Sequence, residues 1–188
     1  MTHGYRIKGK HKRLVPADSA TPHNCVILAV DPATTSGWCV TVAGHYRFSG
    51  ETKMESSGDR LVNAERIAQV VELALNLPCV LLLEKPFARN PETVATLYAV
   101  RRQWKALWKA WAKGHAGKMV DVAVPTWRSK VLGATTGDSL PDLERRVAVY
   151  FAGDRLGGPD ENAAICIAKW GSTAGEVAKV IPKRFWGA

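Results

Sequence analysis

The chain has 188 residues, and 26 Lys and Arg against 17 Asp and Glu give it a formal net charge of +9 at pH 7. This length predicts one domain with a buried core, and no apolar run approaches the roughly 20 residues that span a bilayer. The N-terminus is basic and lacks an apolar signal segment, so we expect a cytoplasmic protein with no membrane partner. The charge favours a polyanionic partner, first of all nucleic acid, and a generally basic soluble protein is the alternative.

Both ends of the chain are polar and basic. Residues 1–24 carry Lys and Arg side chains interrupted by Gly and Pro, which predicts a flexible basic arm. This arm could lie along phosphates or be a solvated tail. Residues 172–188 form a basic, aromatic C-terminal tail. The packed domain is therefore expected over residues 25–171.

Four cysteines lie far apart in the chain, and three of them fall in apolar runs. They show neither CxxC spacing nor a compact disulfide framework. We therefore expect buried thiols in a reducing compartment. The four are Cys25, Cys39, Cys79 and Cys166.

The first apolar run, Val26–Val30, is followed by Asp31 and Pro32. A run this apolar is typical of a strand covered on both faces, and Pro32 ends it because proline has no N–H to donate. Two further strands are expected before residue 53, with turns at Thr34–Gly37 and Ala43–His45. At the end of a buried strand, Asp31 either accepts hydrogen bonds from its own turn or binds a cation.

A second buried strand repeats this pattern. Residues 59–76 show the period of an amphipathic helix, and the apolar run Cys79–Leu83 after it ends in Glu84. Strand, helix and strand form a crossover unit in which the two strands run parallel. If these strands are neighbours, Asp31 and Glu84 leave the same edge of the sheet. Two carboxylates at such a short distance repel each other, so one is protonated or a cation lies between them. Two unrelated acids at strand ends are the alternative.

A long helix is expected over residues 91–113. Basic residues recur along it at every fourth position, which places them on one face, while Leu and Trp side chains occupy another. Like charges at this spacing repel one another, so this face favours contact with phosphates or with the acids of a partner. An ordinary solvated face is the alternative. The basic stripe consists of Arg101, Lys105, Lys109 and Lys113, with Arg102 alongside.

The last third of the chain predicts one strand and three helices. The strand covers residues 119–124, a short helix after it carries Arg128 and Lys130, and a flexible loop over residues 134–140 leads to a helix over residues 141–152. A final helix opens with Asp160 and Glu161, and the small apolar residues behind them predict burial against the sheet. Asp160 either caps this helix or brings a third acid to the two strand ends.

Four segments together resemble the signature segments of the RuvC-type Holliday-junction resolvases, and the match is closest to the phage-encoded relatives. Each segment is weak alone, but their order and spacing are specific. The resemblance covers roughly residues 25–171. The segments are Asp31–Trp38, Glu84–Asn90, Val124–Lys130 and Asp160–Ala168.

This resemblance implies an α/β protein with an RNase H-like fold, in which helices flank a mixed five-stranded sheet. It also implies a homodimer that cuts four-way DNA junctions by paired nicks, with two Mg²⁺ or Mn²⁺ ions in each active site. Asp31, Glu84 and Asp160 would be the metal-binding, catalytic acids, and Arg128 would lie near the scissile phosphate. The residues expected to contact DNA are Lys85, Arg89, Arg101, Arg102, Lys105, Lys109, Arg128 and Lys130.

One position departs from the family pattern. The last helix of the family usually bears a second acid three residues after the first, and this chain has Ala163 there. Glu161 or Asn162 could supply an oxygen ligand instead, and without one the second metal ion would bind weakly. A catalytically weak or inactive junction-binding protein of the same fold is therefore the main alternative. A different RNase H-like nuclease and an actin-like ATPase domain are further alternatives.

Overall fold

The computed structural model describes residues 25–53, 77–87, 90–111, 118–137, 139–153, 157–173 and residue 177. The predicted basic arm over residues 1–24, the helix expected over residues 59–76, and the candidate DNA-binding residue Arg89 lie outside these ranges, as does most of the expected C-terminal tail. None of the helices within the described ranges has the length and apolar character needed to cross a membrane.

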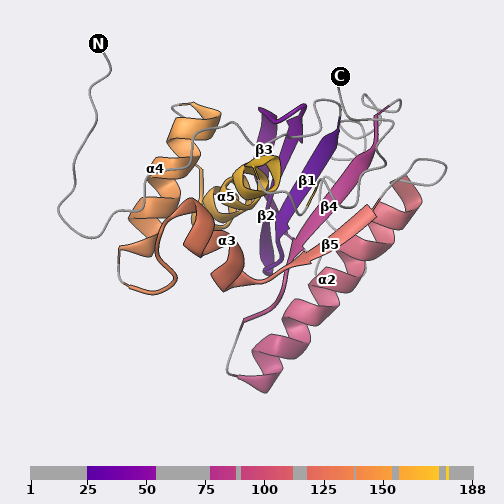
Figure 1. Cartoon of the computed structure of the whole chain (residues 1–188). Helices are drawn as coiled ribbons and strands as arrows, with labels where there is room; N and C mark the ends of the chain where they lie inside the picture. Colours follow the sequence, from indigo (N-terminus) through magenta and orange to yellow (C-terminus); the bar gives the residue numbers. More distant parts are fainter. Residues whose placement is uncertain are drawn as a thin grey trace, which may run out of the picture.

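A five-stranded sheet forms the centre of the molecule (Figure 1). Its strands are β1 (Val26–Asp31), β2 (Thr35–Val42), β3 (His45–Lys53), β4 (Cys79–Glu84) and β5 (Lys118–Val122). They lie in the order β3-β2-β1-β4-β5, with β2 antiparallel and β4 parallel to β1. The prediction of a mixed five-stranded sheet is confirmed, and so is the prediction that the strands before and after the crossover run parallel. The structure also shows that these two strands are neighbours, which the sequence left open.

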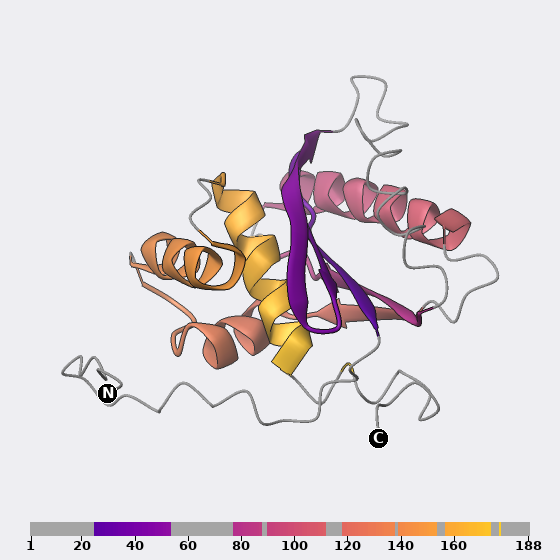
Figure 2. The same cartoon turned by 90° about the horizontal axis from the view of Figure 1, so that it is seen from above.

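Helices cover both faces of this sheet. α2 (Pro91–Trp111) lies along one face, and α3 (Val124–Val131), α4 (Leu140–Ala152) and α5 (Pro159–Thr173) lie on the other, as the view from above shows (Figure 2). α5 packs directly on β1 and β2, while α3 and α4 pack against α5. The sequence predicted a helix in each of these four places.

Two hydrophobic clusters fill the space on either side of the sheet. Val30 of β1 packs with Trp104 of α2, whereas Ala29 packs with α5. Because side chains alternate along a strand, the odd-numbered residues of β1 face α5, and Asp31 falls on that face. All four cysteines are buried, as expected, and none of them forms a disulfide.

Three boundaries differ from the sequence prediction. The strand expected over residues 119–124 is β5, Lys118–Val122, and Val124 already begins α3. The sequence predicts the first turn at Thr34–Gly37, but Gly37 lies within β2. A β-carbon on Gly37 would lie 1.8 Å from the backbone oxygen of Asp160, so this glycine admits α5 close to the sheet. At the other end of the chain, α5 continues to Thr173 and Val177 is fully buried. The packed part of the chain therefore extends past residue 171.

Candidate active site

Asp31 and Glu84 end two neighbouring strands. Val30 of β1 is paired with Leu83 of β4, and the next residue of each strand is the acid. Because the strands are parallel, both acids lie at the same edge of the sheet. The residues two positions earlier in each strand belong to the cluster under α5, so alternation turns both acids toward that face. The structure thus brings these two candidate residues together.

Asp160 reaches the same edge from the start of α5. Gly37 is paired with Asp31 across β1 and β2, and the backbone of Asp160 lies directly over it. A side chain at Gly37 would push the start of this helix away from the sheet. The carboxylate of Asp160 is close enough to raise the pKa of Asp31, after the larger effects of burial and Glu84. The third candidate acid therefore begins its helix at the same sheet edge, within electrostatic reach of Asp31.

The surroundings of Asp31 oppose a negative charge. Burial raises its pKa well above the usual value, and the neighbouring carboxylates of Glu84, Asp160 and Glu144 raise the pKa further. The guanidinium of Arg128 acts in the opposite direction. Negative charge therefore exceeds positive charge around this residue.

Glu84 is fixed through both its side chain and its backbone. Trp127 Nε1 donates a 2.6 Å hydrogen bond to Oε2 of Glu84, and the indole is fully buried. Arg101 of α2 donates to the backbone oxygens of Leu83 and Glu84. Burial raises the pKa of Glu84 to about 7, although the Trp127 hydrogen bond and the charge of Arg128 lower it. A carboxyl group with this pKa is poised between its two protonation states at neutral pH.

Arg128 of α3 lies against a buried glutamate that sequence reasoning missed. Its Nη2 is 3.1 Å from Oε1 of Glu144 on α4, and its guanidinium lies 5.2 Å from the centroid of the Trp127 ring. Glu144 is 7% exposed. Burial raises the pKa of Glu144, and Arg128 lowers it. The sequence held a signal for this residue, because the buried stripe of α4 consists of Leu140, Glu144 and Ala148 and so includes an acid.

Glu161, which the sequence predicts as a metal ligand, is directed elsewhere. Its Oε1 accepts a 2.5 Å hydrogen bond from Ser49 of β3, and the side chain is buried. The structure therefore does not bring Glu161 to the group formed by Asp31 and Glu84. Another residue of β3, Glu51, was missed. The pKa of Asp160 is raised by burial and by the charge of Glu51.

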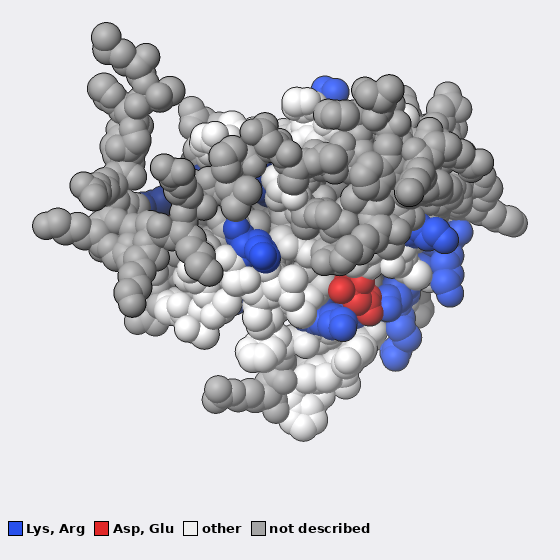
Figure 3. All heavy atoms as spheres, in the orientation of Figure 1, with Lys and Arg blue, Asp and Glu red and all other residues white. Residues whose placement is uncertain are grey.

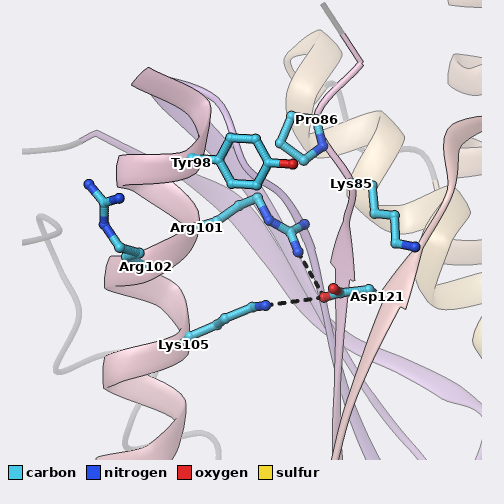
Figure 4. Close-up of a pocket in the computed structure, with 7 residues that line it drawn as sticks. All are labelled: Lys85, Pro86, Tyr98, Arg101, Arg102, Lys105 and Asp121. Carbon is cyan, nitrogen blue, oxygen red and sulfur yellow. Dashed lines mark hydrogen bonds and ion pairs between the residues drawn. The ribbon is translucent and has the colours of Figure 1, made fainter. Parts of the chain in front are cut away.

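A basic hollow lies at the same edge on the α2 face of the sheet (Figure 4). Its volume is about 270 Å³. In the space-filling view, basic side chains surround a small acidic patch in the region of α2 and β5 (Figure 3). The hollow is lined by Lys85, Pro86, Tyr98, Arg101, Arg102, Lys105 and Asp121.

Arg101 does not form part of an exposed DNA-binding stripe, which corrects the sequence prediction for this residue. It is 3% exposed and its Nη2 lies 2.7 Å from Oδ1 of Asp121 on β5. Lys105 Nζ lies 3.4 Å from the same oxygen and its side chain is 36% exposed. This side of α2 faces the ends of β4 and β5, where carbonyl and carboxylate oxygens need donors. Other predicted DNA-contacting residues are exposed, namely Lys85, Arg102, Lys109 and Lys130.

The donor chemistry of the acid group suits a hard divalent cation. As placed, no three His, Cys, Asp or Glu side chains of the described residues converge as a metal site. Asp31, Glu84 and Asp160 nevertheless offer carboxylate oxygens, which are the donors that Mg²⁺ and Mn²⁺ prefer. A cation between them would relieve the repulsion that raises the pKa of Asp31. The residues present therefore fit such an ion.

Comparison with known proteins defines the fold. No family model and no curated protein matches the chain, but solved structures do. The structure of Thermus thermophilus RuvC matches with a TM-score of 0.59 at 15% identity, over 81% of this chain and 96% of RuvC. The fold is RNase H-like. T. thermophilus RuvC in complex with a Holliday junction substrate gives a TM-score of 0.56 at 14% identity, over 82% of this chain and 96% of that one.

A third structure of this group is the yeast mitochondrial Holliday junction resolvase Ydc2. It gives a TM-score of 0.40 at 11% identity, over 81% of this chain and 80% of that one. The likeness to RuvC concerns the fold. The RNase H-like fold accounts for the position of the acids, because its parallel central strands both end at the edge where α5 begins.

Proposed function

We propose that the protein is a metal-dependent, structure-selective endodeoxyribonuclease that resolves four-way DNA junctions by paired nicks. The observation that carries the proposal is the meeting of Asp31 and Glu84 at the ends of neighbouring parallel strands, with Asp160 beside them. The solved complex of T. thermophilus RuvC with a Holliday junction substrate, which shares this fold, supports a junction as the substrate. The net charge of +9 supports a nucleic-acid partner.

Asp31, Glu84 and Asp160 would hold two Mg²⁺ or Mn²⁺ ions. Such ions activate water and stabilise the leaving 3′-oxygen in phosphodiester hydrolysis. The protein's part is to keep the acids in place. Trp127 holds the carboxylate of Glu84 by a 2.6 Å hydrogen bond, and Arg101 holds the end of its strand.

Basic residues on either side of the sheet edge would hold the DNA. Arg128 lies beside the acids and would offset negative charge that develops on the scissile phosphate. Lys85 and Arg102 line the basic hollow and would bind neighbouring phosphates. Two copies in a homodimer would present two active sites to opposite strands of a junction, so that shape rather than base sequence selects the substrate.

A cleavage assay with labelled DNA tests this function. Incubation with Mg²⁺ or Mn²⁺ is expected to give symmetric nicks in a four-way junction and little cutting of a linear duplex of the same sequence. Asp31→Asn is expected to abolish nicking and to leave junction binding intact, as measured by gel shift. Metal-dependent nicking that survives in Asp31→Asn would contradict the assignment.

The second candidate is a junction-binding protein of the same fold without catalysis. Ala163 favours it, because it is buried and stands where the family usually has an acid, and because Glu161 is hydrogen-bonded to Ser49 instead. Junction binding without nicking in any metal would decide for this candidate. The closer likeness to phage-encoded resolvases and the cytoplasmic location stay predictions.

A further inference from the structure

Glu144 is an acid within an otherwise apolar stripe. The buried residues of α4 are Leu140, Glu144 and Ala148, with exposures of 8%, 7% and 2%. This stripe packs against α5, where Cys166 Sγ lies 3.5 Å from the backbone oxygen of Glu144. A carboxylate buried in such a place destabilises the fold unless its charge is matched. Packing alone therefore does not explain why an acid occupies this position.

The pairing of Glu144 with Arg128 is incomplete. Their closest approach is 3.1 Å between Nη2 of Arg128 and Oε1 of Glu144. Within the described ranges, no group donates a well-aligned hydrogen bond to this Oε1, and none accepts one from the buried Nε of Arg128. The arginine also acts on Asp31 and Glu84, whose pKa values it lowers. Arg128 thus contacts Glu144 directly and also lies within electrostatic reach of Asp31 and Glu84.

A chain of contacts links Glu144 to the candidate active site: Arg128 lies 3.1 Å from Glu144 and 5.2 Å from the ring centroid of Trp127, whose Nε1 is hydrogen-bonded to Glu84. The charge of Glu144 raises the pKa of Asp31 and of Glu84, which shows that it lies within electrostatic reach of both. Ala163 is one helical turn before Cys166, the residue of α5 that touches the backbone of Glu144. Ala163 is itself buried, with 4% of its surface exposed, and supplies no carboxylate.

We propose that Glu144 is the fourth acidic ligand of the metal site and replaces, from α4, the acid that is missing at Ala163. This inference rests on the proposed function and adds a residue to its machinery. Glutamate is one methylene longer than aspartate, which suits an approach from a second helix rather than from the helix start itself. When the carboxylate of Glu144 turns to a cation, the guanidinium of Arg128 is released to pair with a phosphate.

The experiment measures Mn²⁺ binding by electron paramagnetic resonance of the free ion, together with junction cleavage. Glu144→Gln keeps the shape and removes the charge, and it is expected to weaken Mn²⁺ binding at least about tenfold. Adding Ala163→Asp to Glu144→Gln is expected to restore most of the binding and some cleavage. Asp142→Asn, on the exposed side of the same helix, is the charge-matched control and is expected to bind Mn²⁺ as the unmodified protein does.

Two results with Glu144→Gln would overturn the inference. One is Mn²⁺ binding by folded Glu144→Gln at the strength of the unmodified protein. The other is weakened binding that Ala163→Asp does not restore, because a residue that only orients Arg128 cannot be replaced by an acid on α5. Ala163→Asp alone covers the case in which Glu144→Gln fails to fold. It should leave Mn²⁺ affinity unchanged or weaker, and tighter binding would mean that the fourth ligand is absent from the natural chain.

Asp31→Asn in the same titration separates this inference from the proposed function. If Asp31→Asn loses Mn²⁺ and Glu144→Gln does not, the metal site stands and Glu144 is no ligand. If Asp31→Asn itself keeps Mn²⁺, the proposed function fails, and the proposal for Glu144 fails with it.

Discussion

The two faces of the sheet differ, at one edge, in how their charges are matched. On the α5 face, burial and the neighbouring carboxylates of Glu84 and Glu144 raise the pKa of Asp31, and burial and Glu144 also raise the pKa of Glu84. Arg128 is the opposing cation for both. On the α2 face, the carboxylate of Asp121 receives two cations of one helix. One face has an excess of acid, and the other an excess of base.

This difference assigns complementary tasks to the two faces. An excess of buried acid favours cations, and an excess of exposed base favours phosphates. The two faces meet at Glu84, whose side chain is bonded to Trp127 on one face and whose backbone oxygen is bonded to Arg101 on the other. Substitutions of the residues that contact Glu84 on each face of the sheet show whether the two faces act separately or together.

Arg101→Met should have the largest effect on stability. The change leaves the backbone oxygens of Leu83 and Glu84 without their buried donor and removes the ion pair with Asp121. Methionine keeps the aliphatic stem, so the loss is mainly polar. We expect the free energy of unfolding to fall by about 3 kcal/mol, measured by urea denaturation.

Arg102→Met is the matched control for Arg101→Met. The next residue of α2 has the same charge but is exposed, so its replacement should change stability by no more than about 0.5 kcal/mol. Equal destabilisation by both substitutions would show that Arg101 does not anchor the ends of β4 and β5.

The buried acids on the α5 face, here called the acid face, should make the metal-free protein less stable as the pH rises. Burial raises the pKa of Glu84 from 4.5 to about 7, so the folded state holds a proton that the unfolded state has released. The stability from this group is full below about pH 4.5 and is lost as the pH rises through 7. We expect a loss of roughly 1–3 kcal/mol over this range, measured by urea unfolding in a chelator. Glu84→Gln should flatten the profile, and an equally steep profile in that variant would assign the effect to other groups.

The sequence was sufficient for the framework of the site and insufficient for its surroundings. Asp31 and Glu84 end apolar runs before prolines, so local pattern and the parallel crossover placed them together. Arg101 was assigned to an exposed stripe because spacing along a helix cannot show that β4 and β5 end opposite one member of that stripe. Glu144 was missed although it has helical spacing from Leu140 and Ala148, because only the packing of α4 on α5 shows that this side of the helix is buried.

Trp127→Phe should disturb the acid face with little effect on the rest of the fold. The change removes the N–H that favours ionised Glu84, so the pKa of Glu84 should rise above about 7. We expect a loss of about 1–2 kcal/mol in stability and a shift to higher pH of the midpoint of Mn²⁺ binding. Trp108→Phe is the same change at a buried indole whose Nε1 has no hydrogen-bond partner among the described residues. If the pH midpoint of Mn²⁺ binding moves equally in both variants, Trp127 contributes through its packing and not through its hydrogen bond.

The smallest effect, a change in DNA affinity, is expected when a single exposed charge is removed from the basic α2 face. Arg102 lines the basic hollow, and Arg102→Ala should weaken junction binding a few-fold without changing stability or Mn²⁺ affinity. Each phosphate contact contributes about 0.9 to the slope of log affinity against log salt, so the slope should fall by about one. Lys118→Ala removes an exposed charge from the start of β5, at the opposite end of the strand from the acid edge, and should leave the slope unchanged. Equal slopes for the two variants would mean that DNA does not pass over the hollow, whereas a selective drop would place the phosphate backbone beside the same strand end that carries Glu84.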